Sequence, residues 1–464
     1  MSSVNLRSSL MHFIYSLLLG LAFLILLPRF LFDAFRRGKY VSGFWERLGS
    51  LAPMQREGRP VIWIHCVSVG ETQAARPLVQ GLRKRFPEIS IAISTITLTG
   101  QNLAREVFKY EADRVFYFPF DWRWIARKTL KVMNPAVVLL METELWPGFL
   151  SECRAQHIPV AIVNGRLSEQ SFRRYWWIRG FMSRVLNAIK VAIMQTEADA
   201  RRLRALGMDA DKTFVCGSLK FDVETTPASD LLTLHFRERF NLADGTPLIL
   251  AASTHAQEER VVLDALKIII SKSKSEPRLM IAPRHPERFA EVATLIEASG
   301  FRWSRRTAPA NPNDDEQSQV ILLDSIGELQ SLYSLASVVF VGGSIVNTGG
   351  HNILEPAAVG ACVITGAYTF NFQLIVETFV NAGAIIQLAP MLHSEATVAL
   401  ADVISDLLTD SAKRQELADL ARRLVDENRG ATERSLELLS SIIPYSEKVV
   451  ESVSSLSAQG APTP

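Results

Sequence analysis

Short apolar runs recur along the first half of the chain and alternate with longer stretches of mixed polarity. Runs of this length and composition are typical of buried strands. They occur at Val61–Val67, Ile89–Thr95, Val115–Phe118, Ala136–Met141, Pro159–Val163, Val191–Gln195 and Thr213–Cys216. Between them, the patterns predict helices that include Thr72–Phe86, Trp122–Met133 and Ser171–Ile189. Regular alternation of strand and helix predicts a parallel sheet with helices on both faces.

The alternation resumes at Pro247 and predicts a second sheet of the same kind. Its strands are expected at Pro247–His255, Arg278–Ala282, Gln319–Leu323, Val338–Val341, Cys362–Thr365 and Ala384–Gln387. The polar, Pro/Asn/Asp-rich segment Ala308–Gln319 predicts a surface loop. We therefore expect an α/β protein with two doubly wound, Rossmann-like domains that face a cleft.

The predicted boundaries follow from these patterns. Residues 41–225 form the N-terminal domain, 226–246 the interdomain link and 247–445 the C-terminal domain. The Ser/Ala/Pro-rich residues 446–464 are expected to be a disordered tail.

An almost wholly apolar stretch, Leu10–Leu27, precedes these domains. As a helix it would be about 27 Å long, close to the hydrocarbon thickness of a bilayer. Arginine and lysine cluster after it, which predicts that the rest of the chain lies on the cytoplasmic side. We predict that residues 1–40 are a single membrane anchor with a basic collar that attracts anionic lipid. Two alternatives stay open: a cleaved signal peptide, which lacks a small-residue cleavage site here, and a helix lying in the membrane interface.

Composition narrows the function classes. The 464 residues carry a net charge of +2, which argues against a strongly basic nucleic-acid-binding protein. The 4 cysteines are far apart without CxxC spacing, and the 8 histidines show no HxxxH or HExxH spacing. We expect reduced core cysteines and neither a disulfide framework nor a metal site.

Polar clusters follow the predicted strands of the first half. Ser68-Val69-Gly70-Glu71 comes directly after the first strand, and Glu71 either complements the dipole of the next helix or acts as a general base. Met141–Pro147 contains two acids one residue apart, Glu142 and Glu144, which folding does not require. We interpret this acidic pair as part of a site.

Three further clusters occupy equivalent places: Ser94–Gly100, where helix capping is the favoured role, Asn164–Ser168 and Gly217–Asp222. Lys220, in the last, either faces an anion or is an ordinary solvated lysine. Since ligands bind at the carboxyl ends of the strands in parallel sheets, all five clusters are expected at one edge.

In the second half, the Gly-rich stretch Gly342–Pro356 follows a predicted strand. Its two glycine pairs allow a sharp turn, and Asn352 is placed to cap a short helix. Backbone N–H groups at such a turn can hold a phosphate or a sugar acid, and Glu355 is within reach of ribose hydroxyls. The alternative is a Gly-rich turn with no ligand.

Other clusters of this half also indicate an anion site. Ser253–His255 and Pro283–Arg288 follow neighbouring strands, and Arg284 is suited to fork onto a phosphate or carboxylate. Ile326-Gly327-Glu328 begins a helix that we expect near a base or ribose.

Taken together, these motifs resemble those of the 3-deoxy-D-manno-oct-2-ulosonic acid (Kdo) transferases of lipopolysaccharide biosynthesis. The resemblance runs from the N-terminal segment to about residue 440. It is carried by SVGE at 68–71, METELWP at 141–147, NGRLS at 164–168, GSLKFD at 217–222, APRHPER at 282–288 and GGSxxxxGGHNxLEP at 342–356.

The resemblance implies a GT-B type glycosyltransferase anchored to the cytoplasmic face of the cell inner membrane. It implies CMP-Kdo as donor, a lipid A precursor (lipid IVA, a tetra-acylated disaccharide bisphosphate) as acceptor, inner-membrane lipids as partners, and no cofactor. Glu71 matches the family's proton acceptor, and Glu144 and Lys220 match its transition-state stabilisers. The CMP-binding positions are Pro283, Arg284, Ile326, Gly327, Glu328, Asn352, Ile353, Leu354 and Glu355.

Two rival hypotheses remain. One is a membrane-associated GT-B enzyme that uses a UDP-sugar. The other is a catalytically inactive nucleotide-binding membrane protein, against which the retained acids Glu71 and Glu144 count.

Overall fold

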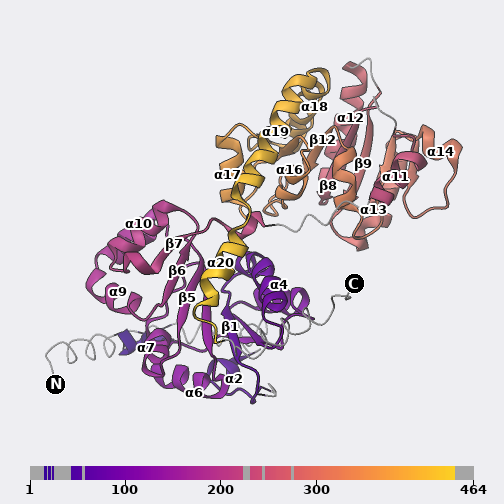
Figure 1. The fold of residues 1–464 in the computed structure, drawn as a ribbon. Coiled ribbons are helices and arrows are strands. Elements are labelled where there is room, and N and C mark those ends of the chain that lie inside the picture. Colours follow the sequence, from indigo (N-terminus) through magenta and orange to yellow (C-terminus); the bar gives the residue numbers. More distant parts are fainter. Residues whose placement is uncertain are drawn as a thin grey trace, which may run out of the picture. The chain divides into compact units, whose positions relative to one another are not determined.

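The structure, a computed structural model, describes residues 15–17, 19–21, 23–25, 43–54, 58–222, 230–242, 246–272 and 276–444. The chain divides into two compact units (Figure 1). The first comprises the described residues up to Asp222 together with those from Arg429 onward, and the second lies within Val223–Asn428.

The first unit is built on a parallel sheet of seven strands, in the order β3-β2-β1-β4-β5-β6-β7, within the described part of the chain. The strands are β1 (Val61–His65), β2 (Ser90–Thr95), β3 (Arg114–Tyr117), β4 (Val137–Met141), β5 (Val160–Gly165), β6 (Val191–Met194) and β7 (Thr213–Val215). The helices are α2 (Phe44–Arg47), α3 (Val69–Ala74), α4 (Arg76–Arg85), α5 (Leu98–Val107), α6 (Arg123–Met133), α7 (Pro147–Ala155), α8 (Glu169–Trp176), α9 (Arg179–Leu186), α10 (Glu197–Ala205) and α20 (Ala431–Ser440).

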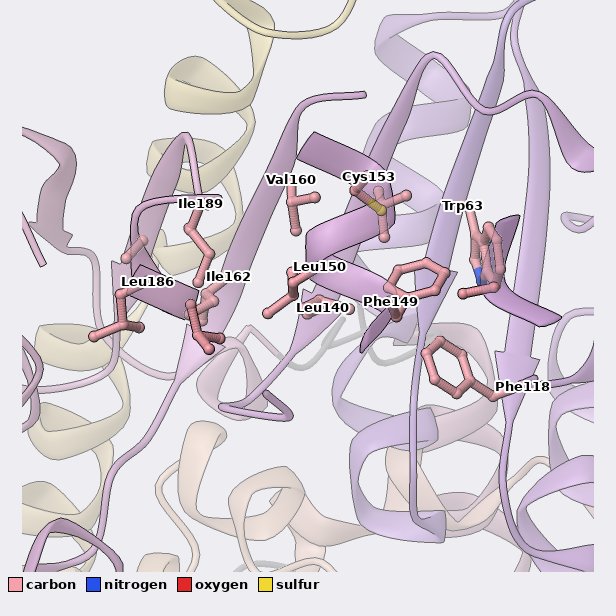
Figure 2. Packing of buried hydrophobic residues seen from close by; sticks show 14 of the residues in the cluster. Trp63, Phe118, Leu140, Phe149, Leu150, Cys153, Val160, Ile162, Leu186 and Ile189 are labelled. Atoms are coloured by element: carbon pink, nitrogen blue, oxygen red, sulfur yellow. The ribbon is translucent and has the colours of Figure 1, made fainter. Parts of the chain in front are cut away.

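The central strands are buried on both faces, as expected for a parallel sheet covered by helices. Trp63 in β1 is fully buried, and its ring lies 5.0 Å from that of Phe149 in α7, centroid to centroid. Figure 2 shows these two rings with Phe118 at one end of a core cluster that continues through Leu150 and Ile162. The Trp63 Nε1–H donates a 2.7 Å hydrogen bond to Ser94 Oγ, so the buried indole has no unpaired donor.

The second unit has its own parallel seven-stranded sheet, in the order β10-β11-β9-β8-β12-β13-β14, counted over the residues described. Its strands are β8 (Leu248–Thr254), β9 (Arg278–Pro283), β10 (Trp303–Arg305), β11 (Val320–Leu322), β12 (Val338–Val341), β13 (Val363–Thr365) and β14 (Ile386–Gln387). Its helices are α11 (Asp230–Arg239), α12 (Glu258–Lys272), α13 (Phe289–Ala298), α14 (Pro312–Gln317), α15 (Leu329–Leu332), α16 (Leu354–Ala358), α17 (Gln373–Asn381), α18 (His393–Thr409) and α19 (Ser411–Asn428). The predicted α/β fold with two doubly wound sheets is confirmed.

Four local predictions were wrong. The strand β10 was missed, α11 lies inside the predicted link, and α14 lies inside the predicted loop. A buried ion pair explains the presence of α11 and α14, because Arg239 Nε of α11 lies 2.9 Å from Asp315 Oδ2 of α14 and fixes both helices. The predicted helix Ser171–Ile189 is two helices, α8 and α9, separated at Trp177 and Ile178.

The C-terminal helix α20 also departs from the predicted domain boundary at 445, because it belongs to the first unit. In Figure 1 it lies against the sheet of that unit. The Asp222 carboxylate accepts a 2.6 Å hydrogen bond from the Gly430 N–H and another from the Thr432 N–H. Leu436 and Leu439 are buried in the core of the first unit. These contacts join segments far apart in sequence, so local patterns do not report them.

Most of the predicted anchor lies outside the described residues, as does the predicted tail. Among the residues that are described, none of the helices is long and apolar enough to span a membrane. Two of the described residues between 15 and 25 contact the start of α6 and the segment just before it. Tyr15 Oη donates a 2.8 Å hydrogen bond to Asp121 Oδ2, and the Phe23 ring lies 5.4 Å from the Trp122 ring.

Candidate functional site

Glu71 is held at the start of α3, directly after β1. The Ser68 hydroxyl caps α3 by accepting from the Glu71 N–H at 3.3 Å and donates to Glu71 Oε1 at 2.8 Å. The Val67 N–H donates to Glu71 Oε2 at 2.7 Å. The residue is buried, with 4% of its surface exposed. Burial raises the pKa of Glu71 to about 8, aided by the charges of Glu142 and Glu144.

The acidic pair lies close to Glu71. Burial, followed by the charge of Glu142, raises the pKa of Glu144. Lys220 Nζ lies 3.6 Å from Glu142 Oε1, so the lysine pairs with Glu142 and not with Glu144. Sequence reasoning interpreted Glu142 and Glu144 together as part of a site but named only Glu144 as a catalytic residue.

Glu142 has a left-handed backbone, with a φ of 54°, which is uncommon for a residue other than glycine. Its N–H donates to the Val163 carbonyl at 2.9 Å, so the turn is tied to β5. Strained backbone of this kind is frequent at functional sites, where the surrounding structure maintains it.

Asn164, near the end of β5, joins this strand to the segment that carries Lys220. Its Oδ1 accepts a 3.0 Å hydrogen bond from the Leu219 N–H, in a short 3₁₀ turn that spans Leu219–Phe221. The Thr143 hydroxyl accepts from the Arg166 N–H at 2.9 Å. The clusters after β1, β4, β5 and β7 thus meet at one edge of the first sheet, as predicted.

In the second unit, the Gly-rich turn differs from expectation. Its N–H groups are already occupied by the carboxylate of Glu258, the first residue of α12. That carboxylate accepts from Gly343, Ser344 and Ile345 at 2.7–2.9 Å and from His255 at 2.9 Å. The prediction that this part of the turn holds a ligand phosphate was wrong, because a buried side chain of the protein supplies the anion.

A basic cluster lies next to this turn, where β8, β9 and β12 end side by side. His255 Nε2 lies 2.9 Å from His351 Nε2, and the two rings stack with centroids 5.1 Å apart. The His285 ring lies 5.1 Å from that of His255, nearly perpendicular to it. Arg284 directly precedes His285 and is exposed, and its N–H donates to the Thr254 carbonyl at 3.0 Å. Sequence reasoning placed the three histidines within clusters expected at an anion site but named none of them individually as a binding residue.

The predicted CMP-binding segment 352–355 forms the start of the short helix α16. Asn352 Oδ1 accepts from the Leu354 N–H at 3.1 Å, and Asn352 Nδ2 donates to Glu355 Oε1 at 3.2 Å. Ile353 and Leu354 are buried. The N-cap residue of α16 is Ile353, so Asn352 bonds the first turn of the helix from one position before the predicted cap.

The segment Ile326-Gly327-Glu328 follows β11, which is the neighbour of β9 in the sheet. Ile326 is 79% exposed and Gly327 has a positive φ of 86°. Glu328 forms a bidentate pair with Arg306, with N–O distances of 3.0 and 2.8 Å. Both of its oxygens are therefore engaged by the protein. Pro283 is the last residue of β9, next to Arg284.

The structure thus assembles the predicted residues into two groups, one on each unit. Glu71, Glu144 and Lys220 belong to the first unit, and the predicted CMP-binding residues to the second. Each group lies at the carboxyl ends of the strands of its own sheet, where ligands of parallel α/β proteins bind.

Comparison with known proteins gives the family. A model of the 3-deoxy-D-manno-octulosonic-acid transferases matches residues 42–223. A 3-deoxy-D-manno-octulosonic acid transferase of Haemophilus influenzae is 35% identical over 391 residues, which cover 84% of this chain and 88% of the relative. One of Bordetella pertussis is 34% identical over 418 residues, which cover 87% and 94%.

Among solved structures, MurG of Acinetobacter baumannii is similar with a TM-score of 0.51 at 12% identity, over 82% of this chain and 99% of that one. This likeness concerns the fold alone, and it agrees with the GT-B type architecture of two doubly wound sheets. The sequence similarity to the two bacterial transferases extends over most of their length. The chain belongs to the 3-deoxy-D-manno-octulosonic acid transferase family.

Proposed function

We propose that the protein transfers Kdo from CMP-Kdo to a lipid A precursor, lipid IVA, with inversion at the anomeric carbon and without a metal ion. The relatives from H. influenzae and B. pertussis carry the name of Kdo transferases, which supports the assignment of Kdo as the transferred sugar. The site geometry supports the mechanism.

The observation that carries the proposal is the environment of Glu71. In the reaction, an acceptor hydroxyl oxygen attacks the anomeric carbon, the bond from that carbon to the phosphate oxygen breaks, and CMP leaves. The hydroxyl proton moves to the Glu71 carboxylate. A pKa of about 8 makes Glu71 a far stronger base, once ionised, than an exposed glutamate, whose pKa is near 4.5.

The neighbouring charges have roles in the same step. Lys220 offsets negative charge on the sugar acid as the donor bond breaks, and its pairing with Glu142 positions it. Glu144, beside Glu142, helps to stabilise the positive charge that develops at the anomeric carbon. Preorganised charges of this kind are a large source of catalysis, since they need no rearrangement during the reaction.

The donor nucleotide is assigned to the second unit, at Pro283-Arg284, Ile326–Glu328 and Asn352–Glu355. The N–H groups of the Gly-rich turn are engaged by Glu258 and are not available to the donor phosphate. The exposed side chain of Arg284 is a cation that can bind this phosphate instead. CMP is a good leaving group, so stabilisation of its phosphate by cationic side chains is sufficient and a metal is not required.

A lipid acceptor requires a membrane surface close to Glu71 and Glu144. Trp176, the last residue of α8, and Trp177, which follows it, are 44% and 89% exposed and come after Arg173 and Arg174. Burial, followed by the charge of Glu144, raises the pKa of Tyr175 in this segment, so the segment adjoins the acidic site. Exposed tryptophans mixed with arginines favour the interface of an anionic membrane.

We assign the protein to the cytoplasmic face of the inner membrane, with its N-terminal segment as the anchor. The contacts of Tyr15 and Phe23 with the first unit favour a helix that lies along the membrane interface over one that crosses it.

The test is mass spectrometry of lipid products formed by the purified full-length protein from lipid IVA and either CMP-Kdo or a panel of UDP-sugars. Addition of Kdo from CMP-Kdo alone supports the proposal. Product from a UDP-sugar alone identifies a different transferase. Absence of product from every donor, with nucleotide binding retained, identifies an inactive nucleotide-binding protein.

A further inference from the structure

We propose that His255 and His351, with Arg284 and His285 beside them, bind the phosphodiester of the donor and take up a proton when it binds. The assignment rests on the proposed function, because it specifies how the CMP-Kdo phosphate is held. It concerns a pair of histidines outside the segments assigned to the nucleotide above.

The geometry of the pair is built by three strand ends. His255 follows β8, His351 lies in the turn after β12, and His285 follows β9. Gly343 makes room for the His351 ring: a Cβ at that position would lie 2.9 Å from His351 Cδ2, and the φ of 67° also favours glycine. The Glu258 carboxylate fixes the Gly-rich turn through its backbone N–H groups. The imidazoles are thus positioned by buried structure.

The short contact limits the number of protons on the pair. Two Nε2 atoms 2.9 Å apart share one hydrogen bond, in which one nitrogen donates and the other accepts. In this arrangement the single Nε2–H of the pair is donated to the other histidine and is not available to an anion. An additional proton breaks the contact and leaves both Nε2–H groups free to donate, which is what a bound anion requires.

The surrounding charges explain why the extra proton is absent before an anion binds. Burial lowers the pKa of His351 to about 4, and the charges of His255, Arg284 and His285 add to this effect. Burial likewise lowers the pKa of His255, with contributions from His285, Arg288 and Arg284. At neutral pH the pair is therefore uncharged in the absence of a ligand.

Three of the nearby carboxylates, those of Glu258, Glu259 and Glu291, are engaged by other groups and do not neutralise the cluster. Glu258 accepts backbone N–H groups, and Glu259 and Glu291 bind Arg288 at 2.6 and 2.9 Å. Glu287 lies 3.7 Å from His285 Nδ1 at the exposed side. A phosphodiester beside the pair would offset the charge of Arg284 and raise the pKa values of both histidines, so binding draws in a proton.

A metal site is the main rival explanation for clustered histidines. Over the part of the chain that the structure describes, no group of three or more His, Cys, Asp or Glu side chains is arranged to hold a metal ion. The direct Nε2–Nε2 contact also points both potential ligand atoms at each other. An anion that accepts from protonated imidazoles fits this geometry better.

The experiment is isothermal titration calorimetry of the full-length protein with the methyl phosphodiester of CMP, whose phosphate does not titrate near neutral pH. Titrations at pH 6.5 in buffers of different ionisation heat give the number of protons taken up. We expect uptake approaching one proton and affinity that falls by up to about tenfold per pH unit between the pKa of the free pair and the higher pKa of the bound pair. Cytidine, which lacks the phosphate, should bind more weakly and without uptake.

The variant that combines His255→Gln with His351→Gln keeps polar side chains at both positions but has no titrating group in the pair. It should lose the proton uptake and the pH dependence, whereas His393→Gln, at an exposed histidine of the same unit, should retain both. Thermal melting checks that every variant is folded. Uptake that persists in the double variant, or its absence from the unsubstituted protein, would overturn the inference while leaving nucleotide binding intact. Failure of the unsubstituted protein to bind either ligand would instead overturn the proposed donor, and the inference with it.

Discussion

At the scale of single residues, Glu71 holds its proton more tightly than an exposed glutamate does. Burial is the largest cause, and the charges of Glu142 and Glu144 add to it, while the Val67 N–H and the Ser68 hydroxyl act in the opposite direction. A base can accept the acceptor proton only when it is ionised. The activity should therefore depend on pH in a range where free glutamate does not titrate.

We predict that kcat/KM rises with pH through about 8, the pKa of Glu71. Of the two neighbouring charges, that of Glu142 has the larger effect on the pKa of Glu71. Glu142→Gln removes this charge and should move the rise to lower pH by about one unit. Glu144→Gln is the matched comparison and should move it less. Rate profiles from pH 5.5 to 9.5 measure the shifts. A rise that stays at the same pH in Glu142→Gln would show that the titrating group is another residue.

A second residue-scale prediction concerns Glu258, whose buried carboxylate holds the Gly-rich turn. Glu258→Ala leaves the N–H groups of Gly343, Ser344, Ile345 and His255 without that acceptor. Buried donors that lose their partner are costly, so the free energy of unfolding should fall by about 3 kcal/mol or more. Urea denaturation measures the change.

The control for this variant is Glu297→Ala, at an exposed position of α13, which should change stability by less than about 0.5 kcal/mol. Equal stability of the Glu258→Ala and Glu297→Ala variants would mean that the turn does not depend on the carboxylate.

At the scale of elements, α20 joins the first unit through its capped start and its buried leucines. Asp222→Ala removes the acceptor for the Gly430 and Thr432 N–H groups and should cost about 1–2 kcal/mol. Amide hydrogen exchange should become faster across α20. Asp222→Asn keeps one cap oxygen and should lie closer to the unsubstituted protein. Unchanged exchange in Asp222→Ala would show that the leucine packing alone holds the helix.

The elements that were predicted correctly are those whose signal is local. Buried apolar runs marked the strands of both sheets, and the polar clusters after them marked the site edges. The Gly-rich turn was located correctly, but its occupant was not, because Glu258 is far away in sequence from Gly343. The strand β10 and the helices α11 and α14 depend on pairing with distant segments, such as Arg239 with Asp315.

The site residues show the same division. Glu71, Glu144, Lys220 and Arg284 were named as candidates because each follows a strand within a recognisable motif. The pairing of Lys220 with Glu142, and the contact of His255 with His351, arise only when separate strand ends meet at the sheet edge.

At the scale of the whole molecule, the N-terminal segment should contribute to membrane association and to the stability of the first unit. Deletion of residues 1–27 removes the Tyr15–Asp121 hydrogen bond and the Phe23–Trp122 contact. We expect a folded protein with a lower melting temperature that partitions less into vesicles containing anionic lipid. Vesicle sedimentation and thermal melting measure both. Unchanged partition would place the main membrane contact elsewhere, with the exposed Trp177 region as the next segment to test.

The central claim is that this chain transfers Kdo with Glu71 as the base. The most direct test compares full-length protein and its Glu71→Gln variant for CMP binding and for Kdo transfer from CMP-Kdo to lipid IVA. We predict that the folded variant binds CMP with unchanged affinity and loses at least about a hundredfold in transfer rate, as expected for removal of a general base. Near-normal transfer by the folded Glu71→Gln variant would contradict the account.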